Sequence, residues 1–266
     1  MMVRRIAKLL AGLLVVWVVG LAIASFALSA RTGRHVADRL GATLQATATI
    51  GDSDLALLRG GLELEDVALR RDDLIGKLSL DIGSVRCDLP PLGLALVDRT
   101  CGDLVVRDIR MEVSTAALFG LQRRKRAPLR ADRVVIDNAD LVFSPSAFLP
   151  SLGRVQIKIE HAEAGPTVFK TPLSWLFSLR ELRASLALPA GITLQLTYRD
   201  GRLGAAGSLF GSTPVEIPIT LPVASAADDA RGELRRLFAF GRELANQLVA
   251  QRAQDWLQKQ LPIQSR

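Results

Sequence analysis

Apolar and polar residues alternate in several stretches of the chain, which is the pattern of a β-strand with one buried face. In residues 60–71 (GGLELEDVALRR) this alternation slips by one position at Asp66 and then resumes. The same slip recurs in two later stretches, at Asp108 within residues 104–113 (LVVRDIRMEV) and at Asn138 within residues 134–143 (VVIDNADLVF). One extra residue inside a strand indicates a β-bulge, which keeps the apolar side chains on one face and adds bend and twist.

A strand that ends at Asp or Asn and is followed by a second strand would give the same local pattern. Three copies with the same phase change favour the repeated bulged strand. The sequence therefore predicts a mainly β protein built on one long, curved and twisted antiparallel sheet with an apolar, groove-like concave face. The candidate residues of this groove are Leu62, Leu64, Val67, Leu69, Leu78, Leu80, Leu104, Val106, Ile109 and Met111.

Further elements follow from local signals along the chain. Residues 43–50 alternate as a first strand, and residues 52–59 read as a short helical link that ends at two glycines. Residues 172–179 (PLSWLFSL) are apolar but of uncertain type. The pair Asp200 and Gly201 predicts a tight hairpin.

Residues 226–266 form a separate C-terminal segment in which the period changes. Apolar residues recur there at three- and four-residue spacing, and charged residues occupy the other positions. This pattern predicts an amphipathic helix. Such a helix would cover part of the apolar face of the sheet, or lie on a membrane surface because its charge is net basic.

The N-terminus predicts a membrane anchor. Residues 9–30 contain no charged side chain, and they match the roughly 20 residues that cross a bilayer. We expect residues 1–8 to form a cytoplasmic tail and residues 31–225 to form a β-groove domain on the other side of the membrane. A cleavable signal peptide is the alternative, since Ala27-Leu28-Ser29 offers a cleavage site, but the apolar run is longer than a typical signal core.

The composition narrows the set of partners. The net charge of +7 is compatible with nucleic acid or with acidic lipid headgroups. No basic helix and no aromatic-plus-basic platform is present, so we expect no nucleic-acid binding. One cluster is a candidate patch for a lipid headgroup or a partner protein, or an ordinary solvated loop; it consists of Arg123, Arg124, Lys125 and Arg126.

Catalytic and metal-binding patterns are missing from the sequence. The two histidines have no partner pattern, and Gly51-Asp52-Ser53 lacks the downstream Asp-x-x-His block that a hydrolase of that type requires. Cys87 and Cys101 could bridge neighbouring strands in an oxidising compartment, or remain two buried thiols. We therefore predict a protein that is not an enzyme and that holds no cofactor or metal.

The anchor, the stretch GGLELEDVALR and the later L-x-[LV]-x-[DN]-[VIA]-x-[LM] strands together resemble the AsmA-like family of the Gram-negative envelope, relatives of chorein-type lipid-transfer proteins. Asp66, Asp108 and Asn138 stand at the Asx position of that pattern. The resemblance covers most of residues 1–145. It implies an inner-membrane, single-pass protein with a periplasmic β-groove and a role in outer-membrane biogenesis.

Two functions are compatible with these features. In the first, the apolar groove binds phospholipid or another envelope lipid and contributes to lipid transport between membranes. In the second, the groove is an ordinary core closed by the C-terminal helix, and the protein is an anchored scaffold of a secretion or outer-membrane machine, similar to the secretion component GspN. In that case its partners are other envelope assembly proteins.

Overall fold

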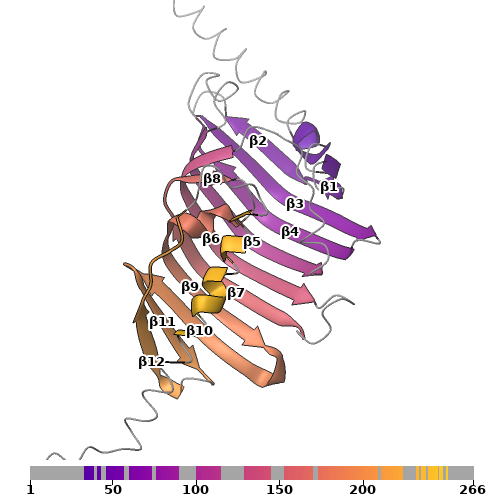
Figure 1. The fold of residues 1–266 in the computed structure, drawn as a ribbon. Coiled ribbons are helices and arrows are strands. Elements are labelled where there is room, and N and C mark those ends of the chain that lie inside the picture. Colours follow the sequence, from indigo (N-terminus) through magenta and orange to yellow (C-terminus); the bar gives the residue numbers. More distant parts are fainter. Residues whose placement is uncertain are drawn as a thin grey trace, which may run out of the picture.

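The computed structural model describes residues 33–38, 41–42, 46–56, 60–73, 76–89, 100–114, 129–144, 153–169, 173–208, 211–223, 232–233, 235–237, 239–244, 246–247 and 250. Over these residues the protein is mainly β, as predicted, and 12 strands form one open sheet (Figure 1). The strands are β1 (Thr47–Thr49), β2 (Asp52–Ala56), β3 (Gly61–Asp73), β4 (Gly76–Cys87), β5 (Thr100–Ser114), β6 (Leu129–Ser144), β7 (Val155–Ala164), β8 (Thr167–Phe169), β9 (Leu179–Leu188), β10 (Ile192–Arg199), β11 (Arg202–Gly207) and β12 (Gly211–Pro218).

The sheet is mixed, so the prediction of an antiparallel sheet is wrong in this respect. Its order is β1-β3-β4-β5-β6-β7-β9-β10-β11-β12, with β2 also paired to β3 and β8 to β6. β5 and β6 are parallel, while the other pairs are antiparallel. A parallel pair needs a connection of about a dozen residues or more, and residues 115–128 between β5 and β6 are long enough to provide it.

The predicted helical link at residues 52–59 is also wrong, because β2 occupies Asp52–Ala56. β1 and β2 pair with β3 in a single register, with Thr49 opposite Ala68 and Asp52 opposite Glu65. They therefore act as one edge strand that is interrupted at Gly51. Asp52 resembles a helix N-cap, but this local helical signal is weak. Pairing with β3 outweighs it, so these residues form a strand.

The phase slips lie side by side as a row across the sheet. Asp66, Asp108 and Asn138 all adopt left-handed backbone conformations, with φ of 51°, 56° and 57°. Asp and Asn tolerate this region better than most residues. Since Gly51 and Gly83 stand opposite these positions, each of the strands from the β1–β2 edge to β6 carries its own extra residue. We call Gly51, Asp66, Gly83, Asp108, Asn138 and Glu160 the kink row.

The predicted bulges are therefore wrong in form for β3 to β6, where the register does not change across the kink row. Along the kink row, two residues oppose one where β7 meets β9, because the register shifts there between Ile159 and His161. Because neighbouring strands kink together, the apolar residues stay in phase on both sides of the row. A bulge in only one strand would have left its neighbour out of phase.

Close packing at the kink row explains the glycine in β4. A Cβ placed on Gly83 would lie 2.9 Å from Cβ of Asp108, whereas a Cβ on Gly61 of β3 would meet nothing within 4 Å. We expect Gly83→Ala to lower the free energy of unfolding by about 1–3 kcal/mol, because the crowded backbone must shift. Gly61→Ala is the matched control and should be neutral or slightly stabilising. Denaturant unfolding compares the two, and equal stabilities would contradict the close approach.

The connections on either side of β10 are short. The predicted hairpin at Asp200 and Gly201 is confirmed, since both have positive φ and join β10 to β11. The apolar stretch of uncertain type contains a 3₁₀ helix, η2 (Ser174–Ser178), and a second one, η3 (Pro189–Gly191), links β9 to β10. Residues 33–38 and 41–42 are helical, as are all the described residues between 232 and 250.

Several predictions fall on residues that the structure does not describe. The anchor at residues 9–30 lies outside the described residues, and so does the basic cluster from Arg123 to Arg126. Within the described part of the chain, no helix combines the length and the apolar character needed to span a bilayer.

Candidate functional site

The sheet presents one apolar face, which is built from rows of directly opposed residues. Opposed residues in neighbouring strands point to the same side of a sheet. From β3 to β6 the rows are Leu62–Cys87–Leu104–Val134, Leu64–Val85–Val106–Ile136, Val67–Ile82–Ile109–Ala139, Leu69–Leu80–Met111–Leu141 and Arg71–Leu78–Val113–Phe143. All ten predicted groove residues lie in these rows, so the structure brings them together on one face.

The same rows continue beyond the predicted groove. On β7 and β9 to β12 they contain Ile157, Ile159, Ala162, Ala164, Leu179, Leu182, Ala184, Leu186, Leu194, Leu196, Tyr198, Leu203, Ala205, Val215 and Ile217. Several are alanines, which carry a weak hydrophobic signal when taken one at a time. Their alternation with charged residues, as in KIEHAEA of β7, was the available clue.

Burial divides the apolar face into two parts. Five of the predicted groove residues are core residues, at most 9% exposed: Leu64, Val67, Leu69, Leu78 and Leu104. On β4 and β5, three consecutive opposed pairs are only half-buried: Val85–Val106, Ile82–Ile109 and Leu80–Met111. We call these six residues the β4–β5 strip. It is a contiguous, partly accessible aliphatic surface, flanked by buried Leu64, Val67 and Leu69 of β3.

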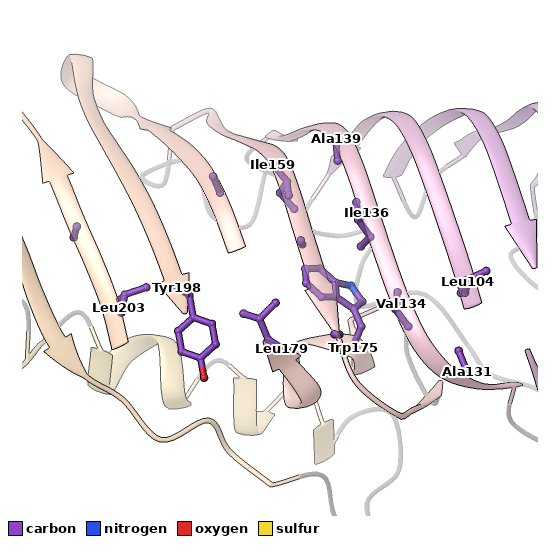
Figure 2. Close-up of a cluster of buried hydrophobic side chains, with 14 of the residues drawn as sticks. Leu104, Ala131, Val134, Ile136, Ala139, Ile159, Trp175, Leu179, Tyr198 and Leu203 are labelled. Carbon is purple, nitrogen blue, oxygen red and sulfur yellow. The ribbon is translucent and has the colours of Figure 1, made fainter. Parts of the chain in front are cut away.

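Further along the sheet, segments outside the sheet cover the apolar face. The indole of Trp175 in η2 is 6% exposed and belongs to one cluster with Val134, Ile159 and Leu179 (Figure 2). Leu244 of the C-terminal helical residues packs against the same cluster. The sequence did not identify Trp175 as a core residue, although its apolar neighbours in PLSWLFSL were noted.

A buried hydrogen bond connects the two segments that cover the apolar face. Ser174 Oγ donates a hydrogen bond to Glu233 Oε2 at 2.8 Å, and these residues are 4% and 1% exposed. Glu233 lies in the C-terminal helical residues, so this bond links them to η2. The yellow helical turns in Figure 1 run across the middle of the sheet, in agreement with this contact.

The opposite face of the sheet carries charged side chains that pair across strands. Arg107, Asp137 and His161 follow one another on β5, β6 and β7, with His161 Nδ1 at 2.7 Å from Asp137 Oδ1. On the same face Arg133 donates two hydrogen bonds of 3.0 Å to the carboxylate of Glu163. These contacts lower the pKa of Glu163 and raise that of Arg133.

This pair predicts a modest acid dependence of stability. Because the pKa of Glu163 is lower in the folded protein, its contribution is present above the ordinary pKa of 4.5 and is lost as the pH falls through the folded value. Since the pair is solvent-exposed, we expect the effect to be small. Glu163→Gln should flatten the loss of stability below about pH 4.5, measured by urea unfolding across pH. If the stability of Glu163→Gln falls below about pH 4.5 as steeply as that of the wild type, the prediction is wrong.

A groove of about 580 Å³ follows the kink row. Its lining includes Asp66, Asp108 and Asn138, together with the opposed residues Asp81, Arg110, Asp140 and Lys158. It is therefore lined by charged groups of both signs, and Ile82 and Ile109 of the β4–β5 strip also belong to its lining. Among the described residues, no group of three or more His, Cys, Asp or Glu side chains is arranged to hold a metal ion.

A disulfide joins Cys87 at the end of β4 to Cys101 near the start of β5, with Cα atoms 5.6 Å apart. Cys87 is opposed to Leu62 and Leu104 in the first of the apolar rows. The disulfide therefore fixes one border of the apolar face next to the β4–β5 strip. A bond of this kind is typical of an oxidising compartment.

Comparison with known proteins adds no functional assignment. No family model matches the sequence, and no curated protein matches it either. The candidate site is therefore an apolar sheet face that is partly accessible at the β4–β5 strip and partly covered near Trp175.

Proposed function

We propose that this protein is a membrane-anchored envelope protein that binds lipid on the apolar face of its sheet, in the manner that the AsmA-like resemblance implies. The observation that carries the proposal is the β4–β5 strip. Six opposed aliphatic side chains remain partly accessible there, beside the buried Leu64, Val67 and Leu69 of β3. A contiguous accessible apolar surface of this kind is typical of sites that bind a protein, a membrane or an apolar ligand.

The strip suits an acyl chain that lies along β4 and β5, because its three pairs follow one another along these strands. Its side chains are aliphatic, and no charged residue stands among the three pairs. Each methylene removed from water against such a surface contributes about 0.8 kcal/mol, so a chain of several methylenes binds without any specific polar contact. Binding of this type requires no covalent chemistry, which agrees with a function that is not enzymatic.

The N-terminal residues support a position close to the membrane. Gly33 lies against Ser53 and Ile50 at the β1–β2 edge of the sheet. It follows the predicted anchor of residues 9–30 directly in sequence. If the anchor spans the inner membrane, the β1–β2 edge is the part of the sheet closest to the bilayer, and the β4–β5 strip lies two strands away from it.

The alternative is an anchored scaffold of a secretion or outer-membrane machine. The observation in its favour is the cover formed by Trp175, Leu244 and the Ser174–Glu233 contact, which closes part of the apolar face. In a scaffold the β4–β5 strip would contact another envelope protein instead of lipid.

Mass spectrometry of the purified protein separates the two functions. The full-length chain is extracted from membranes in a polymer that retains native lipid, and the lipids are identified after washing. Lipid binding predicts co-purified phospholipid at about one or more molecules per protein, in excess over an unrelated single-pass protein prepared in the same way. Equal lipid in both samples, together with envelope proteins crosslinked through the strip, would favour the scaffold.

A further inference from the structure

The C-terminal helical residues have one face toward the sheet. Four side chains among them are buried or half-buried, at spacings of four, three and four residues: Glu233, Leu237, Phe240 and Leu244. These spacings place the four side chains on one stripe of a helix. The exposed positions are mostly polar and include Arg235, Arg236, Arg242, Glu243, Asn246 and Gln247.

The stripe is not a continuous hydrophobic contact. Leu237, Phe240 and Leu244 are only half-buried, whereas Glu233 is 1% exposed. The most deeply buried group of the segment is thus a carboxyl group that accepts a hydrogen bond from Ser174. An isolated carboxylate is costly to bury, so its hydrogen-bond partners decide whether it stays in place. Among the described residues of the segment, the most deeply buried contact is therefore a polar one.

We propose that the helical residues described between 232 and 250 belong to a displaceable lid over the apolar face, held closed at the Ser174–Glu233 hydrogen bond. When this bond breaks, the segment leaves as an amphipathic helix with a polar outer surface, and it uncovers the part of the face near Trp175 and Leu179. The inference rests on the proposed function only for what enters beneath the lid, which is the acyl part of a lipid.

Hydrogen–deuterium exchange of the full-length protein in nanodiscs tests the lid without relying on lipid binding. We expect amides of residues 232–250 to exchange in a step separate from β6 and at least about tenfold faster. Ser174→Ala should accelerate exchange of this segment by roughly tenfold or more, since a hydrogen bond to a charged group is lost. Exchange in β6 should not change.

Two variants serve as controls. Ser178 lies in the same 3₁₀ helix, but its hydroxyl group bonds Thr167 and the backbone of Trp175, so Ser178→Ala should leave exchange of the segment unchanged. Glu233→Gln keeps an oxygen that accepts the bond from Ser174, so it should stay within about threefold of the wild type. Equal exchange in Ser174→Ala and Ser178→Ala, or exchange of the segment only together with β6, would overturn the lid.

Uptake of a phospholipid with a fluorescent acyl chain, supplied in vesicles, tests what the lid controls. Ser174→Ala should take up this lipid several-fold faster than the wild type and Ser178→Ala. Slower or equal uptake in Ser174→Ala would overturn the gating role. If no variant takes up lipid while Ser174→Ala still accelerates exchange, the proposed function fails and the lid contact stands.

Discussion

Replacing Leu80 with glutamate is expected to reduce lipid bound by the protein at least about tenfold. Leu80 is half-buried in the β4–β5 strip, opposite Met111 and Leu69. A carboxylate at this position would have to lose its hydration when an acyl chain covers it, at a cost of several kcal/mol. Since Leu80 is not fully buried, the variant should still fold. Lipid content is measured by mass spectrometry of the purified protein.

Ser79→Glu is the matched control for this variant. Ser79 precedes Leu80 in β4 and points to the opposite face, where its neighbours across the strands are Arg70 and Glu112. The added charge therefore meets one attractive and one repulsive partner, and the apolar face is untouched. We expect normal lipid content in Ser79→Glu. Equal lipid content in both variants would show that the β4–β5 strip does not bind lipid.

Replacing Trp175 with alanine is expected to lower the free energy of unfolding by about 3–5 kcal/mol, as is typical of a buried tryptophan. The indole is 6% exposed and fills the space between η2 and the sheet beside Val134, Ile159 and Leu179 (Figure 2). Its loss leaves a cavity on the apolar face, which strands cannot close without losing their pairing. Denaturant unfolding followed by circular dichroism measures the change.

Trp175→Phe distinguishes packing from other effects of this substitution. Phenylalanine retains most of the apolar volume and lacks only the larger ring and its N–H group, so this variant should lose clearly less stability than Trp175→Ala. A loss below about 1 kcal/mol in Trp175→Ala would contradict the cluster as described, since a core tryptophan costs more than a surface residue.

The alternating pattern was sufficient to predict the apolar face because the period of a strand assigns each side chain to a face. The slips at Asp66, Asp108 and Asn138 were recognised as single extra residues, and all three adopt left-handed conformations. The sequence of one strand does not show what its neighbour does, however. A phase change near Gly83 is visible in the alternation of residues 78–89, but only the pairing shows that Gly51 and Gly83 stand opposite the slips and turn separate bulges into a shared kink row.

Other features depend on contacts between distant segments and had no local signal. The parallel pairing of β5 and β6 depends on how the two strands meet in the sheet, and a single strand reads the same in either direction. The contact of Ser174 with Glu233 joins residues 59 positions apart, and neither residue belongs to a recognisable pattern. Within the predicted groove, the division between core and accessible strip likewise depends on what covers each row.

Photo-crosslinking from Met111 tests lipid binding on the apolar face most directly. A photoreactive amino acid replaces Met111 in the β4–β5 strip, and in a second protein it replaces the neighbouring Arg110 on the opposite face. After irradiation in cells, the account predicts a covalent phospholipid adduct at position 111 and little or none at position 110. Protein adducts without lipid at position 111, or equal lipid adducts at both positions, would contradict it.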